Sequence, residues 1–399
     1  MYEGKFFENF IILEDKREQG KVKHKIIDIV FIVISAVICG CNEWKDIKLW
    51  LSCDVNVNWL KKYVELYNGV PSLSTIGRLF NIISPKQFEK CFANWMKEAI
   101  ELPNEDIVSI DGKTMRGTIE EGSTKGVHIV SAICKSYGLV VGQVKTHEKS
   151  NEITAIPELL DMLQIKGCVV SIDAMGCQKD IAKKITKDCK ADYVISLKGN
   201  QEGLHNDVIE CFDNLRFDKK IEKIDKAYNV SGENGEAIGD KELELLKTKD
   251  FGHGRIEIRR YYYTQNLKYV DMQGKWEGLK GVGMVIRDVE IKGKATRETS
   301  YFISSLAGVK AFEKAVRGHW NVESMHWSLD VTYKDDANKT RKGTAPQNMA
   351  LLKRIALNSV KNDTKRKPKE SMKGKRFLAL MDFDYRDYLI ELNFKNKMN

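Results

Sequence analysis

The first hundred residues place apolar and polar positions with a helical period. Apolar residues recur every three or four positions in IDIVFIVISAVICGC, NEWKDIKLWLS and NWLKKYVELY, and SPKQFEKCFANWMKEAI repeats the pattern. PSLSTIGRLFNII begins with a Pro-Ser pair that suits a helix N-terminus. The most apolar run, Ile26–Cys39, contains Asp28 and is too short to cross a bilayer, so it predicts a buried helix. The pattern predicts a helical N-terminal domain over residues 1–103.

From Asp106 the pattern changes to short β-branched runs. IVSIDG, GVHIVSAICKS and GLVVGQVKT predict three consecutive strands with turns between them. NEITAIPELLDMLQI then predicts a helix, CVVSIDAM a strand, QKDIAKKITKDCKA a helix and DYVISLKGN a strand. The order βββαβαβ predicts an α/β core, a mixed sheet with flanking helices, that begins at residues 104–200.

The chain beyond residue 200 leaves this core and returns to it. An acidic, Gly-containing region leads to RIEIRRYYYT, VGMVIRDVEI and ETSYFISSL, which predict a β-rich insertion over residues 201–306. A helical pattern returns in KAFEKAVRGHWNVESMHWSLD, so the second part of the core is expected at residues 307–360. Residues 361–399 form a basic C-terminal segment.

Charge is concentrated in one part of the chain, whose formal net charge is +9. Between Lys339 and Arg376 there are 13 Lys and Arg residues against Asp363 and Glu370, a local net charge of +11. Such a block is typical of a contact with a phosphate backbone, although a solvated tail would look the same.

The cysteines indicate a reducing environment. There are nine, an odd number, and no pair has the C-x-x-C spacing. Neither a disulfide framework nor a zinc knuckle is therefore expected, and a cytoplasmic protein without a membrane partner fits best.

Two predicted strands end in the same way. IVSIDGKT places Asp111, and VVSIDAMG places Asp173, where an apolar run stops at an acid followed by a small residue. A sheet presents catalytic groups at such strand ends. Each Asp alone could instead cap the next turn or helix. Two of them on strands that could be neighbours favour a site.

A third acid lies on the returning helix, in RGHWNVESMHWSLD. At about 100° per residue, His319, Glu323, His326 and Asp330 fall on one face. Three carboxylates from Asp111, Asp173 and Glu323 would suit two Mg²⁺ or Mn²⁺ ions, which prefer hard oxygen ligands and support phosphodiester chemistry. The alternative for Glu323 is an ordinary surface position.

Five blocks in order carry a family resemblance: IDGKTMRGT, VSIDAMGCQKDIA, YVISLKGNQ, GHGRIEIRR, and the stretch from RGHWNVES to LLKRIALN. Together with DKREQGKVKHK, CNEWKDIKLWL and NGVPSLSTIGRLF near the N-terminus, they resemble the ISAs1-type branch of the IS4-like DDE transposases, which includes the H-repeat-associated proteins. The resemblance implies an RNase H-like core in which Asp111, Asp173 and Glu323 form the DDE triad. Their spacings are 62 and 150 residues, and the second leaves room for the insertion.

The resemblance also implies an activity and partners. The expected function is metal-dependent cleavage at transposon ends followed by strand transfer, with Mg²⁺ or Mn²⁺ as cofactor. The N-terminal helical domain and the basic segment would bind DNA, both the ends and the target, with the protein a homo-oligomer on DNA. A bacterial cytoplasmic protein is implied, at the nucleoid when bound. Two alternatives are a nuclease without strand transfer and a domesticated or inactive DNA-binding protein.

The resemblance transfers less well to helper residues. Many IS4-like enzymes carry Tyr, Arg and Lys where this chain has Val316, His319 and Asp330, and Arg317 lies two residues from the expected Arg. The two Trp residues of the helix, Trp320 and Trp327, are expected to pack in the core. The residues predicted as helpers or DNA contacts are His319, His326, Asp330, Arg317, Arg255, Arg259, Arg260, Asn200, Gln201, Lys339, Arg341 and Lys342.

Overall fold

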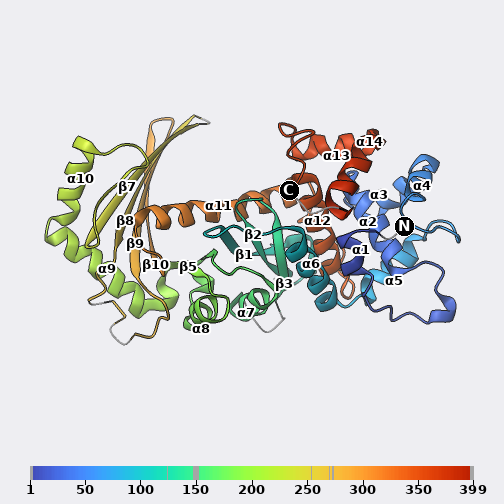
Figure 1. The fold of residues 1–399 in the computed structure, drawn as a ribbon, viewed down its shortest axis with the longest axis horizontal. Coiled ribbons are helices and arrows are strands. Elements are labelled where there is room, and N and C mark those ends of the chain that lie inside the picture. The colour runs from blue at the N-terminus through green and yellow to red at the C-terminus, as the bar shows by residue number, and fades with distance from the viewer. Residues whose placement is uncertain are drawn as a thin grey trace. The chain divides into compact units, whose positions relative to one another are not determined.

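The computed structural model describes residues 3–123, 125–146, 152–252, 254–268, 270–271 and 274–395. It divides into two compact units. The first comprises Met1–Leu102, Asp111–Gln164 and Asn321–Asn399, and the second Pro103–Ile110 and Ile165–Trp320. Strand β1 (Ile107–Met115) and helix α11 (Val309–Val331), both labelled in Figure 1, have residues in each unit. The domain boundaries predicted from the sequence differ from the limits of these two units, and they stay a prediction.

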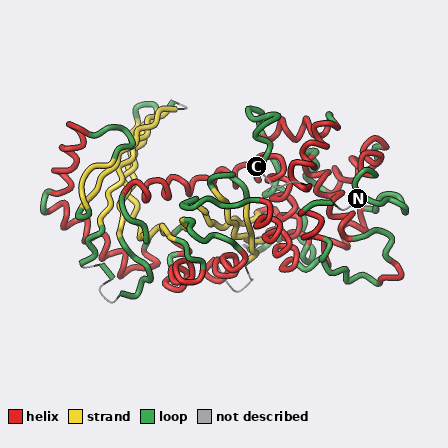
Figure 2. The backbone as a smooth tube through the Cα atoms, in the orientation of Figure 1, coloured by secondary structure: helices red, strands yellow, loops and turns green. Residues whose placement is uncertain are grey.

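The described secondary structure of the first hundred residues is helical, as predicted, and Figure 2 draws these helices in red and the loops between them in green. The described helices are α1 (Lys5–Phe10), α2 (Ile26–Ile38), α3 (Trp44–Leu51), α4 (Asp54–Leu60), α5 (Leu73–Ile82) and α6 (Pro85–Ala99). Every residue of α2 is buried, which confirms the prediction for the apolar run. The Ser72 hydroxyl accepts a hydrogen bond from the Thr75 N–H and caps α5, so the Pro-Ser signal marked a true helix start.

Helix α12 (Ala345–Lys361) joins the helices of the first unit to its strands. It packs against α2, α5 and α6 on the helical side and against β2 (Val127–Cys134) and β3 (Val140–Lys145) on the strand side. Its Asn358 side chain donates to the Val140 carbonyl (2.8 Å) and accepts from the Val140 N–H (2.9 Å). The amide thereby pairs with the edge strand β3 as another strand would.

The C-terminal residues fold onto the same helices as α13 (Met372–Met381), α14 (Phe383–Ile390) and a π-helical turn, Glu391–Lys395. The basic block was predicted to contact a phosphate backbone. This prediction is corrected for four of its residues, because Lys353, Arg354, Lys375 and Arg376 are buried. Arg376 donates to the Val37 carbonyl (2.7 Å). A buried charge needs partners of this kind, so four of the basic residues serve the interior and are not a DNA surface.

The strands of the first unit are β3, β2 and the end of β1, with β2 between the other two. Strands β2 and β3 are antiparallel and are covered by α7 (Glu152–Met162). The helix was predicted from Asn151, which lies outside the described residues.

The second unit continues from the start of β1. Its strand order is β1, β4 (Val169–Ile172), β5 (Asp192–Leu197), β10 (Lys294–Ser304), β9 (Gly281–Ile291), β8 (Arg255–Thr264), β7 (Leu243–Gly252) and β6 (Ala237–Asp240). Strands β4 and β5 are parallel to β1, and every pairing from β5 to β6 is antiparallel. The insertion therefore extends the core strands through the β5–β10 pair, and α8 (Lys179–Lys183) links β4 to β5.

The insertion begins with two helices that the sequence reading missed. Residues 201–306 were predicted to be strand-rich, but α9 (Glu202–Phe217) and α10 (Lys220–Ser231) precede the strands. The buried residues of α9 are Leu204, Val208, Phe212 and Leu215, a helical spacing that the acidic, polar composition obscured. In Figure 1 the two helices lie along the strands, and α9 contacts β10 while α10 contacts β7.

The predicted fold class is confirmed. The protein is an α/β protein with an RNase H-like mixed sheet, flanking helices, a strand-rich insertion and a helical N-terminal domain. Within the second unit, the first half of α11 covers the strands, and Phe312 stacks on the Tyr263 ring with centroids 5.2 Å apart.

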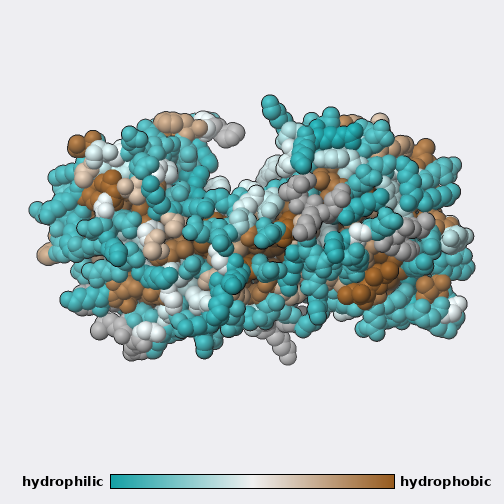
Figure 3. Space-filling view, in the orientation of Figure 1, coloured by the Kyte–Doolittle hydropathy of each residue, from teal (hydrophilic) through white to brown (hydrophobic). Residues whose placement is uncertain are grey.

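Hydrophilic side chains cover most of the face shown in Figure 3, and apolar side chains form separate patches. Among the described residues, no helix is both long enough and apolar enough to span a membrane.

Candidate active site

Two neighbouring strands lead to the predicted acids. Strands β1 and β4 pair in parallel, with Ile110 opposite Ile172. The next residue is Asp111 on one strand and Asp173 on the other. Because parallel strands point the same way, each acid follows the carboxyl end of the paired segment, which is where α/β sheets hold ligands. The register thus supports the prediction that the two strands are neighbours. Asp173 follows the end of β4 as predicted, whereas Asp111 lies within β1, which continues to Met115.

Asp173 caps the turn that follows it. Its Oδ1 accepts hydrogen bonds from the N–H groups of Met175 (3.0 Å) and Gly176 (3.4 Å) at the start of a 3₁₀ turn, Ala174–Gly176. Asp173 therefore does cap the following turn, which was the structural alternative to a catalytic role. Capping also fixes the direction of the carboxylate, which a metal ligand requires as well.

Asn200 and Gln201 hold the same turn. The Asn200 side-chain amide donates to the Ala174 carbonyl (2.6 Å), and that of Gln201 donates to the Cys177 carbonyl (2.9 Å). Their amide groups thus support the loop after Asp173 in this structure. A contact with DNA by these two residues stays a prediction.

The polar stripe of α11 reaches the core strands at its first predicted position. In the second unit, His319 Nδ1 lies 3.1 Å from Ser171 Oγ on β4. Burial lowers the pKa of His319, so its imidazole is neutral at neutral pH. His319 consequently forms a hydrogen bond with β4, and it does not supply a positive charge to a DNA phosphate.

Two further positions of the stripe contact β1 within the first unit. His326 Nδ1 lies 3.5 Å from Asp111 Oδ2. Asp330 pairs with Lys113 Nζ at 2.8 Å, and Asp336 reaches the same nitrogen at 2.7 Å. Lys113 therefore binds the end of α11 and the following loop to the strand that carries Asp111.

Glu323 is exposed on α11, three positions before His326. Residues three apart on a helix are neighbours on one face, so Glu323 lies one turn from the imidazole that contacts Asp111. Glu323 was predicted to share this face of the helix with His326. Its role as the third metal ligand stays a prediction.

The structure brings forward an acid that the sequence reading missed. Glu152, at the start of α7, places a carboxylate oxygen within 4.8 Å of one from Asp111. His128 Nε2 lies 2.8 Å from Glu152 Oε1, and His128 Nδ1 lies 2.7 Å from Thr114 Oγ1. NEITAIPELL was read only as a helix start, where Glu is common, so its sequence carried no distinctive signal.

The donor atoms around Asp111 fit a divalent cation. Carboxylate oxygens from Asp111 and Glu152 are the hard ligands that Mg²⁺ and Mn²⁺ prefer. A Cβ atom at Gly112 would overlap Glu152 Oε1 and His128 Nε2, so only glycine at this position leaves room for both side chains. The space beside Asp111 is therefore shaped for them.

The predicted arginine contacts in the insertion divide into two groups. Arg259 is 5% exposed, bonds Asp250 at 3.0 Å and pairs with Glu257, so its charge is neutralised inside the sheet and the prediction of a phosphate contact is corrected. His253, in the same block, lies outside the described residues. Three arginines are partly exposed and each pairs with an acid: Arg255 with Glu257 (3.3 Å), Arg260 with Asp288 (2.5 Å) and Arg317 with Asp250 (3.5 Å). Their contacts with DNA stay a prediction.

The prediction that Trp320 and Trp327 pack in the core is wrong. They are 41% and 64% exposed, and the Arg287 guanidinium lies 5.7 Å from the Trp320 ring centroid. The core stripe of α11 is Val309, Phe312, Ala315, Val322, Met325 and Leu329. Both Trp residues fall beside this stripe, because their positions do not match its three- and four-residue spacing.

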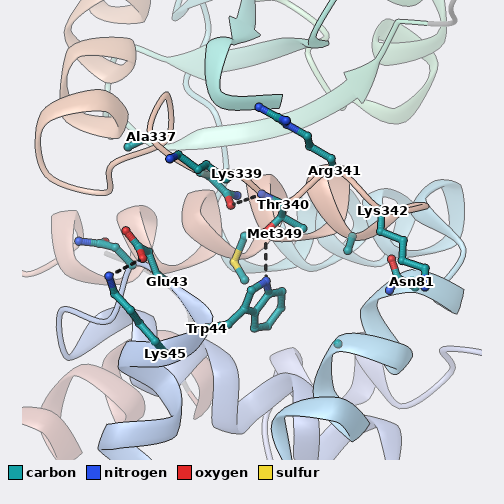
Figure 4. A pocket seen from close by; sticks show the side chains of 14 residues that line it. Glu43, Trp44, Lys45, Asn81, Ala337, Lys339, Thr340, Arg341, Lys342 and Met349 are labelled. Carbon is teal, nitrogen blue, oxygen red and sulfur yellow. Dashed lines mark hydrogen bonds and ion pairs between the residues drawn. The ribbon is translucent and has the colours of Figure 1, made fainter. Parts of the chain in front are cut away.

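Three predicted DNA contacts, Lys339, Arg341 and Lys342, are exposed on one loop of the first unit. They line a cavity of about 560 Å³ together with residues of α3 and α5, as Figure 4 shows. Trp44 Nε1 donates to Thr340 Oγ1 (3.0 Å) and holds the loop against α3. A fixed loop with three cations beside a cavity has the charge expected for phosphate binding.

Comparison with known proteins identifies the family. The family described as "Transposase DDE domain" matches residues 102–359, and the one described as "DDE_Tnp_1-associated" matches residues 7–96. The first match covers more than half of the chain. The chain therefore belongs to the transposases with a DDE domain.

Two relatives of nearly the same length support this assignment. The chain is 40% identical over 375 residues to "Putative transposase YncI" of Escherichia coli O157:H7, covering 90% of this chain and 89% of that protein. It is 38% identical over 389 residues to "H repeat-associated putative transposase YhhI" of Escherichia coli K12, covering 96% of each. A solved piggyBac transposase synaptic complex with hairpin DNA aligns with a TM-score of 0.41 and 11% identity, covering 98% of this chain and 82% of that one.

The protein is thus a DDE transposase of the H-repeat-associated kind, which confirms the predicted family and enzyme class. Membership implies that it binds DNA and uses a divalent metal ion.

Proposed function

We propose that this transposase cleaves DNA at the ends of its element and joins the freed 3′-OH to a target phosphodiester, with Asp111, Asp173 and Glu323 as the catalytic acids. The observation that carries the proposal is the β1–β4 register, in which an acid directly follows the last paired residue of each parallel strand. The family match supplies the reaction class.

The three acids would hold Mg²⁺ or Mn²⁺, whose oxygen preference fits their carboxylates. Ions bound there would activate the attacking oxygen and stabilise the leaving oxygen. The chain's own residues fix the ligands: the Met175 and Gly176 N–H groups orient Asp173, and His326 contacts Asp111. Holding the attacking hydroxyl close to its target phosphate would provide much of the remaining acceleration.

The DNA would be held by exposed cations. Lys339, Arg341 and Lys342 form the best supported surface, because the loop is fixed and none of the three is buried. We further propose that two chains assemble on DNA, since two ends must be brought together before joining. The expected place of action is the bacterial cytoplasm, at the nucleoid.

The test is an assay of products with labelled DNA from the element's flanks, in Mg²⁺ or Mn²⁺. Joined products are expected from the wild-type chain. Nicks without joining would indicate a nuclease, and binding without nicks would indicate a DNA-binding protein.

The assignment of Glu323 is tested separately by comparison of Glu323→Gln with Asp330→Asn. We expect Glu323→Gln to abolish joining and Asp330→Asn to retain it in part, because Asp330 pairs with Lys113. The reverse result would move the third ligand to Asp330.

A further inference from the structure

Glu152 has the surroundings of a ligand and not of an ordinary surface acid. Its side chain is only 12% exposed, although it stands at the first residue of α7. An oxygen of this carboxylate lies within 4.8 Å of an Asp111 oxygen. Two carboxylates held so close repel each other unless a cation lies between them.

A relay of side chains orients this carboxylate. An ionised carboxylate can only accept, so His128 Nε2–H donates to Glu152 Oε1 at 2.8 Å. The other ring nitrogen, Nδ1, lies 2.7 Å from the Thr114 hydroxyl oxygen. Thr114 lies on β1, three residues after Asp111, and His128 lies on β2. The relay therefore ties Glu152 to the strand that carries Asp111.

Gly112 provides independent support. It lies next to Asp111, and any Cβ there would overlap both Glu152 Oε1 and His128 Nε2. Because Gly112 is not in the left-handed region, its backbone does not require glycine, and the approach of these two side chains does.

We propose that Glu152 is a fourth carboxylate ligand of the metal site and that His128 is its positioning residue; this rests on the proposed function of Asp111. Charge balance agrees with the assignment. Two divalent cations carry four positive charges, whereas the three predicted acids supply three negative charges and Glu152 supplies the fourth. Carboxylates that bind a metal ion are themselves held by hydrogen bonds from groups around the site, and His128 supplies such a bond to Glu152.

The test is a titration of the full-length chain with Mn²⁺. Binding is measured by the decrease in the electron paramagnetic resonance signal of free Mn²⁺. We expect Glu152→Gln to weaken Mn²⁺ binding by about 10- to 100-fold or to remove one bound ion. Glu158→Gln is the matched control, since Glu158 lies on the same helix and pairs with Lys86 at 3.6 Å. It should bind Mn²⁺ as wild type does.

The variant Asp111→Asn distinguishes a failure of the role proposed for Glu152 from a failure of the proposed metal site itself. If Asp111→Asn loses Mn²⁺ while Glu152→Gln retains wild-type affinity and stoichiometry, the role of Glu152 is overturned and the proposed function stands. If both variants bind like wild type, or if the wild-type chain retains no Mn²⁺ at millimolar concentration, the proposed site itself fails.

The positioning role of His128 is tested by His128→Ala and His128→Gln. We expect His128→Ala to weaken Mn²⁺ binding by about tenfold, and His128→Gln to recover part of it, because a Gln amide can still donate to Glu152. Thermal melting of each variant reports folding separately. Equal Mn²⁺ affinity in wild type and His128→Ala would contradict the role.

Discussion

At the level of single residues, the site depends on a position that has no side chain. Gly112 follows Asp111 and leaves the space that Glu152 and His128 occupy. Both obstructing atoms belong to the far ends of flexible side chains, so an added methyl group can be accommodated by moving them. The expected damage is therefore to the geometry of the site more than to the stability of the fold.

Gly112→Ala should accordingly fold but lose activity. We expect strand transfer to fall about tenfold or more, as is typical when the outer support of a metal site is disturbed, with a melting temperature near that of wild type. Gly203→Ala on α9 is the control, because a Cβ there meets no atom within 4 Å. Full strand transfer by Gly112→Ala at limiting Mn²⁺ would show that the site tolerates the displacement.

Glu89, a buried acid of helix α6, predicts how stability depends on pH. Burial raises the pKa of Glu89 from 4.5 to about 7, while Gln347 donates to it at 2.8 Å. Between pH 4.5 and about 7 the unfolded chain releases a proton that the folded chain retains. Stability from this residue is therefore complete below pH 4.5 and is lost as the pH rises through about 7.

Glu89→Gln should remove this loss, because the amide oxygen can accept the same hydrogen bond. We expect the variant to unfold in urea at nearly the wild-type concentration at pH 4, and to be more stable than wild type by up to about 3 kcal/mol at pH 8. A variant that is less stable than wild type at pH 8 would mean that the ionised carboxylate is stabilised in the folded protein.

The residues of the site differ in how far the sequence could reveal them. Asp111 and Asp173 were predicted because each stands where a short apolar run stops, although only β4 ends there and β1 continues to Met115. Glu152 was missed because a Glu at a helix start is common, and only the folded chain brings it to Asp111. Arg259 pairs with Glu257 on its own strand and with Asp250 on the preceding one, and the alternating charges of RIEIRR do not show that this arginine is buried.

At the level of elements, α11 carries two stripes with different purposes. One is polar and reaches Ser171, Asp111 and Lys113. The other is apolar, and its first residues, Val309, Phe312 and Ala315, pack on the strands of the second unit. The helical period predicted the polar stripe correctly. It did not decide which of the remaining positions the core would cover, and so Trp320 and Trp327 were assigned to the wrong environment.

Phe312→Ala tests the apolar stripe. Phe312 is fully buried, stacks on Tyr263 and fills the space above Gly283, where a Cβ would overlap its ring. Removal of the ring leaves a cavity, so we expect a loss of about 3–5 kcal/mol in the free energy of unfolding. Phe217→Ala, at an 87% exposed position, should change stability by less than about 0.5 kcal/mol. Similar losses for both variants would contradict the packing of α11.

At the level of the whole molecule, net charge alone is a poor guide to the DNA surface. The basic block was found from composition, yet the fold places four of its cations inside. What remains outside includes the loop with Lys339, Arg341 and Lys342. The order of helical region, core, insertion and returning helix was predicted from changes in period, whereas the helices α9 and α10 were hidden by their polar, charged composition.

Replacement of these three cations by Gln should reduce the salt dependence of DNA binding. Each lost phosphate contact lowers the slope of log K against log salt by about 0.9, so we expect the slope to fall by about 3. A control variant replaces three exposed lysines of the α10 region, Lys219, Lys223 and Lys226, and should keep the wild-type slope. An unchanged slope in the loop variant would exclude this loop as a phosphate surface.

The central claim is that Asp111 is a catalytic acid of a DNA-joining enzyme. Strand transfer by the wild-type chain and by Asp111→Asn, measured on the same labelled end with DNA affinity determined in parallel, tests it most directly. The account predicts joined product from wild type and a loss of about 1000-fold or more in the variant, with DNA binding unchanged. Joined product at the wild-type rate from Asp111→Asn would contradict the account.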